Sequence, residues 1–234
     1  MNDEKNYFLT FAIPTRNRAP ELRECLESIL HEILQSKHAI EIVVSDNASS
    51  DQTESILKEY QTKYAFIKYF RLQQNMGYDL NLLNAIQKSS GNYIWTFSDD
   101  DLVTNGAVNH ICKLIEQTSP NYILTNYSQF TIKEGIKVFP SQDKAIIKFD
   151  KMVKMVLKDL DFIHISLKMT YTMSFLSINI YKSNEIDTFA VKPNLQFLKS
   201  WSHIFLFAQS TRSGGGVITP FKCVSQRTQK CREP

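Results

Sequence analysis

Short apolar runs alternate with amphipathic segments through the first half of the chain. Each apolar run predicts a β-strand, and the runs cover residues 8–13, 40–44, 67–72, 93–97 and 122–125. Segments with a helical pattern lie between them and predict helices over residues 21–34, from 51 onward, over 79–88 and over 106–117. Strands that alternate with such helices are typical of an α/β fold, with a mostly parallel sheet and helices on both faces.

The pattern weakens beyond residue 130. It predicts a hairpin over residues 131–137, a short amphipathic helix over 149–157, an extended segment over 171–181, a helix over 201–208 and a flexible turn at 213–216. The polar and basic end, residues 225–234, is expected to be loosely ordered. A length of 234 residues fits one domain.

Four polar clusters follow the predicted strands of the first half. Right-handed crossovers place the carboxyl ends of parallel strands along one edge of the sheet, where open α/β sheets bind ligands. We therefore expect the clusters to converge on one crevice. They cover residues 14–18 (PTRNR), 45–51 (SDNASSD), 74–77 (QNMG) and 98–101 (SDDD).

The last cluster contains three consecutive aspartates, Asp99, Asp100 and Asp101. Three like charges at the end of a strand repel one another unless a cation neutralises them. Mg²⁺ and Mn²⁺ accept carboxylate oxygens and keep positions for phosphate, so a divalent cation explains the cluster. The alternative is a turn or a helix cap, for which a single aspartate would suffice.

Composition and charge narrow the possible partners. The net charge is +3 and no dense Lys/Arg run is present, which argues against nucleic-acid binding. No apolar run approaches the roughly 18 residues of a transmembrane helix, and the first residues lack the basic start of a signal peptide. The four cysteines show no paired spacing, which argues against zinc and disulfides. These observations predict a cytoplasmic protein.

The four clusters, in this order and spacing, resemble those of the GT-A glycosyltransferases of family 2. The matching stretches are residues 13–18 (IPTRNR), 44–51 (VSDNASSD), 75–77 (NMG) and 89–101 (SSGNYIWTFSDDD). The sequence of residues 77–79 and 97–102 is similar to that of abequosyltransferase-like enzymes of bacterial surface polysaccharide synthesis. The resemblance implies a GT-A, Rossmann-like fold with a donor-binding half over residues 1–130 and an acceptor-binding half over residues 131–234, within a single domain.

The resemblance also implies roles for individual residues. Pro14, Thr15 and Arg16 would surround the base and ribose of the donor nucleotide, and Arg16 could meet phosphate. Asp46 would accept a hydrogen bond from the base. Asn75 and Gly77 would form a loop against the donor, because glycine permits a positive φ and a close backbone approach.

Other residues keep more than one possible role. Asp79 could touch the sugar or ribose, or cap the helix that follows it. Asp99 and Asp101 match the outer positions of the family's DXD motif, with Asp101 as the direct metal ligand and Asp99 near the ribose or the water around the metal. Asp100 would meet the donor sugar or the metal. The cofactor implied is Mn²⁺ or Mg²⁺.

An inverting enzyme also needs a general base for the acceptor hydroxyl. The family often supplies it from an acidic motif in the second half, and no clear Glu-Asp pair is present here. His203 and Asp161 are the candidates, although a histidine at the start of an apolar helix is more often a core or capping residue.

The predicted function is transfer of a hexosyl or deoxyhexosyl group from a nucleoside-diphosphate sugar to a saccharide or lipid-linked saccharide. The basic residues Lys222, Arg227, Lys230 and Arg232 suggest peripheral association with the inner face of the membrane. Two alternatives remain: a nucleotidyltransferase acting on a sugar phosphate, and a nucleotide-sugar-binding protein with impaired catalysis. The first alternative usually has a glycine-rich loop after strand one, and residues 14–18 contain no glycine.

Overall fold

The computed structural model describes residues 7–133, 136–138, 153–155, 176–194, 202–212 and 215–228. Strands and helices alternate through the first half, as the hydrophobic pattern predicts. In chain order they are β1 (Tyr7–Thr15), α1 (Ala19–Ile33), β2 (Ile40–Asp46), α2 (Thr53–Lys63), β3 (Ile67–Arg71), α3 (Tyr78–Gln87), β4 (Gly91–Thr96), β5 (Leu102–Val103), α4 (Ala107–Thr118) and β6 (Tyr122–Lys133).

The second half adds shorter elements to the same sheet. They are β7 (Ile136–Val138), β8 (Val153–Met155), β9 (Asn179–Lys182), α6 (Thr188–Val191), α8 (Ser202–Arg212) and β10 (Gly216–Arg227), with single 3₁₀ turns at Leu176–Ile178, Ser183–Glu185 and Lys192–Asn194. Buried apolar residues from both halves form one hydrophobic core. The division into donor and acceptor halves stays a prediction.

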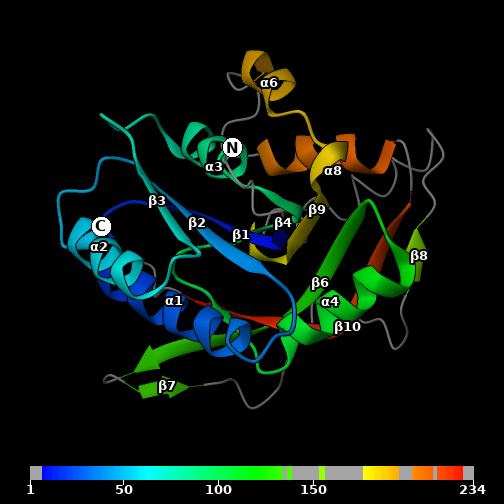
Figure 1. The fold of residues 1–234 in the computed structure, drawn as a ribbon, viewed down its shortest axis with the longest axis horizontal. Helices are drawn as coiled ribbons and strands as arrows, with labels where there is room; N and C mark the ends of the chain where they lie inside the picture. The colour runs from blue at the N-terminus through cyan, green and yellow to red at the C-terminus, as the bar shows by residue number, and fades with distance from the viewer. Residues whose placement is uncertain are drawn as a thin grey trace.

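The strand order is β3-β2-β1-β4-β9-β6-β10-β5, with β7 beside β6 and β8 beside β10. Strands β3, β2, β1 and β4 are parallel, and β6 and β10 share their direction, whereas β9 runs against its neighbours β4 and β6. The sheet is therefore mostly parallel, as predicted. Helices α1, α2 and α4 lie on one face and α3, α6 and α8 on the other (Figure 1).

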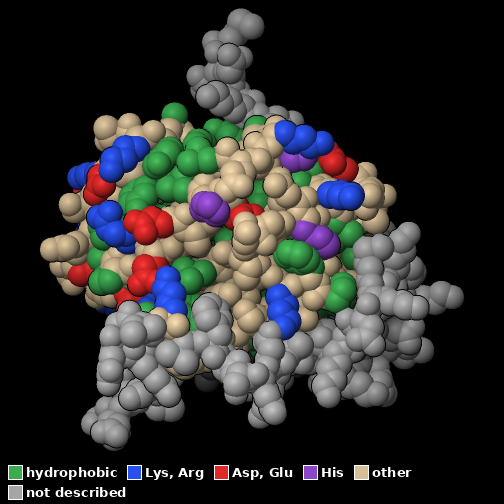
Figure 2. Space-filling model, turned by 90° about the horizontal axis from the view of Figure 1, so that it is seen from below, with side chains coloured by type: hydrophobic (Ala, Val, Ile, Leu, Met, Phe, Trp, Pro, Cys, Tyr) green, Lys and Arg blue, Asp and Glu red, His purple; other side chains and the backbone are tan. Residues whose placement is uncertain are grey.

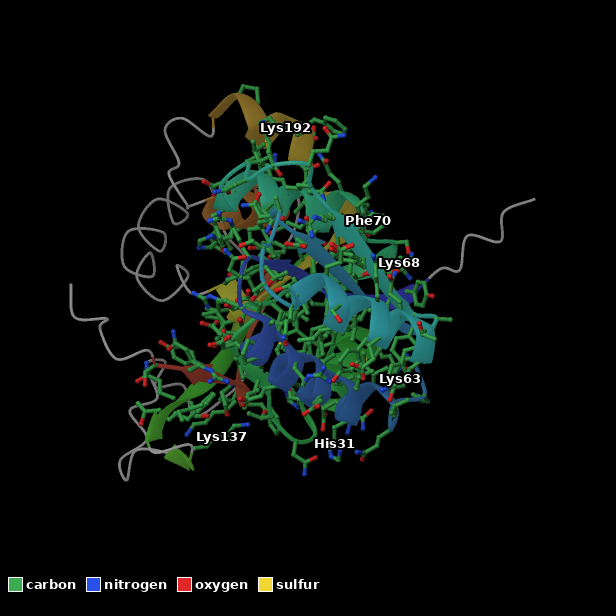
Figure 3. All side chains as sticks on the ribbon, turned by 90° about the vertical axis from the view of Figure 1, so that its left-hand side faces the viewer. His31, Lys63, Lys68, Phe70, Lys137 and Lys192 are labelled. Carbon is green, nitrogen blue, oxygen red and sulfur yellow. The ribbon has the colours of Figure 1, made fainter. Side chains whose placement is uncertain are left out.

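Strand β3 forms an edge of this sheet. Figure 3 looks onto that edge, where Lys68 and Phe70 are labelled. The face turned toward the viewer in Figure 2 carries acidic and basic side chains interspersed among one another, and no single basic patch gathers there.

Three local predictions were wrong. The apolar run over residues 8–13 predicts a strand that stops before Pro14, but β1 continues to Thr15, and Pro14 pairs in register with Ser45 of β2. The nitrogen of Pro14 points toward the β4 side of β1, because backbone groups alternate between the two sides of a strand. The pairing of β1 with β4 ends at Ala12, so no hydrogen bond between these strands is lost through the missing N–H of the proline.

The other two errors concern the second half. Residues 153–155 form β8 against β10 instead of part of a helix, and the rest of the predicted helix lies outside the described residues. Residues 225–227 are not loosely ordered, because β10 extends to Arg227 beside β6. A sheet partner far along the chain overrides the amphipathic helical pattern at the first place and the polar composition at the second. The hairpin around residues 134–135 is confirmed by the antiparallel pairing of β7 with β6.

Candidate functional site

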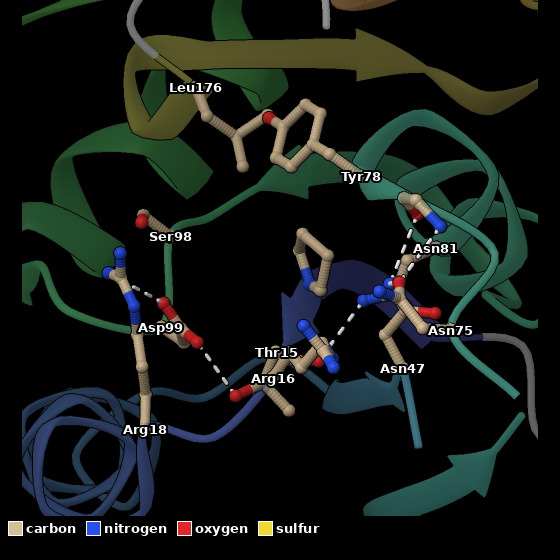
Figure 4. A pocket seen from close by; sticks show the side chains of 12 residues that line it. Thr15, Arg16, Arg18, Asn47, Asn75, Tyr78, Asn81, Ser98, Asp99 and Leu176 are labelled. Carbon is tan, nitrogen blue, oxygen red and sulfur yellow. Dashed lines mark hydrogen bonds and ion pairs between the residues drawn. The ribbon is translucent and has the colours of Figure 1, made fainter. Parts of the chain in front are cut away.

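A cavity of about 420 Å³ lies at the carboxyl edge of β1, β2 and β4 (Figure 4). Ligand pockets commonly measure roughly 300–1,000 Å³. The residues that line it come from all four predicted clusters, from the start of α3 and from the turn before β9. They are Pro14, Thr15, Arg16, Arg18, Asn47, Asn75, Gly77, Tyr78, Asn81, Ser98, Asp99 and Leu176. The expected convergence of the clusters on one crevice is thus present in the structure.

Asn47 holds the loop that follows β3 against the end of β2. Its side-chain amide donates to the Asn75 side-chain oxygen at 2.8 Å and to the Gly77 carbonyl at 3.2 Å, and its own oxygen accepts from the Met76 N–H at 2.7 Å. Gly77 has φ +83°, a left-handed conformation that suits glycine. The sequence reasoning did not single out Asn47, although it stands inside a cluster already identified.

Asp46 lies behind the cavity wall. The side chain is fully buried, and its oxygens accept hydrogen bonds from the Ser49 N–H at 2.9 Å and the Tyr69 hydroxyl at 3.0 Å. It does not line the cavity, whereas its neighbour Asn47 does. The role of Asp46 toward a base stays a prediction.

The three aspartates after β4 are all buried, and each carboxylate has a hydrogen-bond donor. Asp99 accepts from the Thr15 hydroxyl at 2.7 Å, and Asp100 accepts from the Ser98 hydroxyl at 2.6 Å. Asp101 accepts from the Ser177 hydroxyl at 2.6 Å and from a backbone N–H of β10 at 3.1 Å. Only Asp99 of the three lines the cavity. Ser177 was not anticipated, because the extended segment predicted over residues 171–181 carried no signal for a functional residue.

Burial also changes the acidity of the cluster. Desolvation raises the pKa of Asp99 to about 7, against the lowering effects of the Arg18 charge and the Thr15 hydrogen bond. Desolvation and the Asp100 charge raise the pKa of Asp101 to about 8. Buried carboxyls next to one another resist ionisation, so the cluster gains from any cation that neutralises it.

Two arginines supply positive charge at the cluster. The Arg18 Nη1 atom is 3.4 Å from an Asp99 carboxylate oxygen and also contacts the Asp100 carboxylate. Arg227 of β10 donates from Nε to the Asp100 carbonyl at 3.1 Å, and its guanidinium pairs with Glu24 at 3.1 Å. Arg227 was assigned to a basic tail by the sequence, but the structure builds it into the site.

Two further candidates lie outside the cavity wall. Asp79, in the first turn of α3, accepts a hydrogen bond at 3.2 Å from the N–H of Ser202, the first residue of α8. It therefore caps a helix that is remote in sequence. His203, the next residue of α8, is buried, and its carbonyl accepts from the Tyr181 hydroxyl at 3.0 Å. Asp161 lies outside the described residues.

The donor chemistry of the site fits a hard divalent cation. Within the described ranges no three His, Cys, Asp or Glu side chains are grouped as a complete ligand set. Mg²⁺-type sites commonly use only one or two carboxylates and complete their coordination with substrate phosphates and water. Asp99 at the cavity wall and Asp101 behind it supply such carboxylates.

None of the helices in the described part of the chain is long and apolar enough to cross a membrane.

The sheet order and the acid-flanked cavity at its carboxyl edge define the GT-A class of α/β folds. The fold is similar to that of Staphylococcus aureus TarS in complex with UDP-GlcNAc, with a TM-score of 0.68 and 18% identity over 95% of this chain and 59% of that one. It is also similar to the mannosyltransferase PcManGT from Pyrobaculum calidifontis in complex with GDP-Man and Mn²⁺, with a TM-score of 0.61 and 14% identity over 97% and 59% of the two chains. At these identities the likeness shows the fold, and the predicted GT-A class is confirmed.

Sequence comparison identifies the family. The model of glycosyl transferase family 2 matches residues 10–176, and the chain belongs to that family. Its curated relatives include the abequosyltransferase RfbV of Salmonella typhimurium, 39% identical over 103 residues, which are 43% of this chain and 30% of the relative. Another is a Campylobacter jejuni GalNAc(5)-diNAcBac-PP-undecaprenol β-1,3-glucosyltransferase, 35% identical over 129 residues, which are 54% of this chain and 40% of the relative.

These matches confirm the family predicted from the four clusters. They do not favour the alternative of a nucleotidyltransferase. The matched segments span well under half the length of both curated relatives.

Proposed function

We propose that this protein is a glycosyltransferase that moves a hexosyl or deoxyhexosyl group from a nucleoside-diphosphate sugar to a saccharide or lipid-linked saccharide. The setting would be bacterial surface polysaccharide synthesis, which is supported by the relatives that carry abequosyltransferase and undecaprenol-linked glucosyltransferase names. The observation that carries the proposal is the position of Asp99. Its carboxylate forms part of a cavity wall to which all four strand-end clusters of a family 2 fold contribute, together with the start of α3 and the turn before β9.

The cavity offers the groups that a nucleoside diphosphate needs. Arg16 and Arg18 line it and carry positive charge for phosphate oxygens. The side chains of Asn47 and Asn75, together with the backbone at Gly77, present hydrogen-bonding groups on the wall across from Arg18 (Figure 4). We assign base and ribose contacts to this wall and to Pro14.

We further propose that the protein uses Mn²⁺ or Mg²⁺, held by Asp99 and Asp101. When bound, the cation would neutralise charge on the nucleoside diphosphate that departs. The Mn²⁺ complex of the PcManGT structure supports this choice of metal. Within the chain itself, the hydroxyls of Thr15 and Ser177 orient the two carboxylates.

The inverting reaction requires a base for the acceptor hydroxyl, and His203 and Asp161 stay our candidates. We also propose a cytoplasmic location with peripheral association at the inner face of the membrane, since lipid-linked acceptors lie there. Flotation with anionic vesicles at low salt tests this association. Absence of binding would contradict it.

A thermal-shift screen tests the donor site. The protein is heated with UDP, GDP, CDP or dTDP, each with Mn²⁺, and we expect one nucleotide to raise the melting temperature most, because a ligand that binds only the native state stabilises it. The matched variants are Asp99→Asn and the control Glu59→Gln, an exposed carboxylate on α2. We expect the shift to vanish in the first variant and to persist in the second. A chain that no nucleotide stabilises would refute the proposed donor site.

Donor hydrolysis tests catalysis separately. Wild-type protein with Mn²⁺ and the selected nucleotide sugar should release nucleoside diphosphate, and Asp101→Ala should abolish this release. Binding without turnover would leave the alternative of a catalytically impaired nucleotide-sugar-binding protein.

A further inference from the structure

Arg18 occupies an unusual place for a basic residue. It is the N-cap of α1, where the first backbone N–H groups of the helix point outward and the helix dipole disfavours a positive charge. Its side chain makes no capping bond, and Asp51 instead accepts from the N–H of Ala19, the first residue of α1, at 3.0 Å. The local helix therefore gives no reason for an arginine at this position.

The acid cluster provides that reason. A single nitrogen, Arg18 Nη1, contacts both the Asp99 and the Asp100 carboxylates, which are nearly buried at 7% and 12% side-chain exposure. The guanidinium is thus a permanent cation shared between two carboxylates. A divalent metal ion at the acid cluster would likewise be a cation shared between carboxylates.

The contact of Arg18 with the aspartate cluster differs from the contact that Arg227 makes with the same cluster. The Arg227 side chain is only 12% exposed, and its guanidinium is fixed by the Asp100 carbonyl and by Glu24. The Arg18 side chain is 36% exposed and lines the cavity. Arg18 therefore has open space on the side from which a phosphate-bearing ligand would enter.

We propose that Arg18 holds the place of the divalent cation in the donor-free protein and transfers to the donor diphosphate when the cation binds. This inference rests on the proposed function, because it assumes that a cation and a nucleoside diphosphate meet at Asp99. The two cations compete at Asp99, the carboxylate that the guanidinium contacts and that the proposed metal site includes. The guanidinium released from Asp99 becomes available to phosphate. Arg18 is accordingly a positioning residue that links metal binding to donor binding.

The proposal predicts opposite changes in two affinities when Arg18 is replaced by methionine. Without the competing guanidinium, Arg18→Met should bind Mn²⁺ alone on the order of tenfold more tightly than wild type, because two cations at the Asp99 carboxylate repel each other. With Mn²⁺ saturating, the nucleoside diphosphate selected by the thermal-shift screen should bind on the order of tenfold more weakly, because a phosphate partner is lost. If Arg18 had only a structural role, its replacement would weaken the binding of both Mn²⁺ and the nucleoside diphosphate.

Mn²⁺ affinity is measured by electron paramagnetic resonance of the free aqua ion, and nucleotide affinity by isothermal titration calorimetry. Arg23→Met is the matched control, because Arg23 lies on the same helix and its guanidinium pairs with the exposed Glu59 at 3.2 Å. We expect neither affinity to change in this control. If Arg18→Met fails to fold, Arg18→Lys replaces it. The lysine side chain is shorter and keeps its charge, so this variant should tighten Mn²⁺ binding by a smaller factor than Arg18→Met.

The outcomes separate the two proposals. If wild type binds no Mn²⁺, the proposed metal site and this inference both fail. If wild type binds Mn²⁺ and the Arg18 variant binds it equally or more weakly, the inference is wrong while the proposed function stands. Tighter Mn²⁺ binding together with weaker nucleotide binding would establish the exchange.

Discussion

Raising the pH from 5 to 8 should destabilise the cation-free protein through its buried aspartates. The folded state raises the pKa of Asp99 to about 7 and that of Asp101 to about 8, from an ordinary value of 3.8. Between these values the folded chain keeps a proton that the unfolded chain has released. Stability falls with rising pH wherever the folded state binds more protons, so the loss begins above pH 4 and ends near pH 8.

The size of the effect follows from the number of protons involved. One proton held only by the folded state changes the free energy of unfolding by about 1.4 kcal/mol per pH unit. For one carboxyl this amounts to about 3 kcal/mol between pH 5 and 7. The second carboxyl adds a similar contribution, because ionisation of one aspartate hinders that of the other and so keeps the second proton bound. The total stability of a domain is commonly about 5–15 kcal/mol, so the change is readily measured.

Urea unfolding at pH 5, 6, 7 and 8 measures this slope in wild type and in Asp101→Asn. The asparagine can donate to the Ser177 hydroxyl, which has a free lone pair, so the substitution preserves the local contact at modest cost. We expect the variant to lose about 1.4 kcal/mol per pH unit less than wild type. Added Mn²⁺ should stabilise wild type more at pH 8 than at pH 5, because the cation competes with the protons.

Equal slopes in the two proteins would refute the reasoning, since the buried proton would then not be on Asp101. A wild-type stability that rises from pH 5 to 8 would contradict it as well. Ser225→Ala serves as the control, because Ser225 is a buried residue of β10 and the substitution involves no carboxyl. Its stability should fall with pH at the same slope as that of wild type.

Three further substitutions test other parts of the structure. Asn47→Ala removes three hydrogen bonds from the loop at the cavity and should weaken nucleoside diphosphate binding about tenfold in calorimetry, at a stability cost of about 1 kcal/mol. Asp79→Ala removes the cap of α8 at Ser202 and should lower the melting temperature by about 2–4 °C without changing nucleotide affinity. Gly91→Ala places a Cβ 2.8 Å from the backbone nitrogen of Thr10 and should cost about 2–3 kcal/mol in urea unfolding.

Each of these expectations has a contrary result. Unchanged nucleotide affinity in Asn47→Ala would show that the loop after β3 does not touch the nucleotide. Reduced nucleotide affinity in Asp79→Ala, at unchanged stability, would favour a sugar or ribose contact over the cap. Wild-type stability in Gly91→Ala would mean that β1 and β4 separate at no cost at this position.

Local pattern was sufficient for the elements of the first half. Apolar runs and helical periodicity located strands β1 to β4 and helices α1 to α4 to within a few residues, because each of these elements buries one continuous face against the same core. Only the two-residue β5 was missed, since a strand that short leaves no periodicity. In the second half, β8 and β10 depend on partners far along the chain. The local pattern predicted a helix at β8, and at β10 it predicted no strand and a loosely ordered end.

The sequence by itself determined the family, the sheet edge at which polar residues gather and the presence of an acid cluster that needs a cation. The tertiary structure alone decided which member of each cluster faces the cavity: Asn47 does, and the adjacent Asp46 turns into the core. It also supplied the partners of the acids, Arg18 and Arg227, and assigned Asp79 to a helix 123 residues away. The physical reason is that side-chain direction and long-range hydrogen bonds follow from packing, in which neighbouring residues can point to opposite sides.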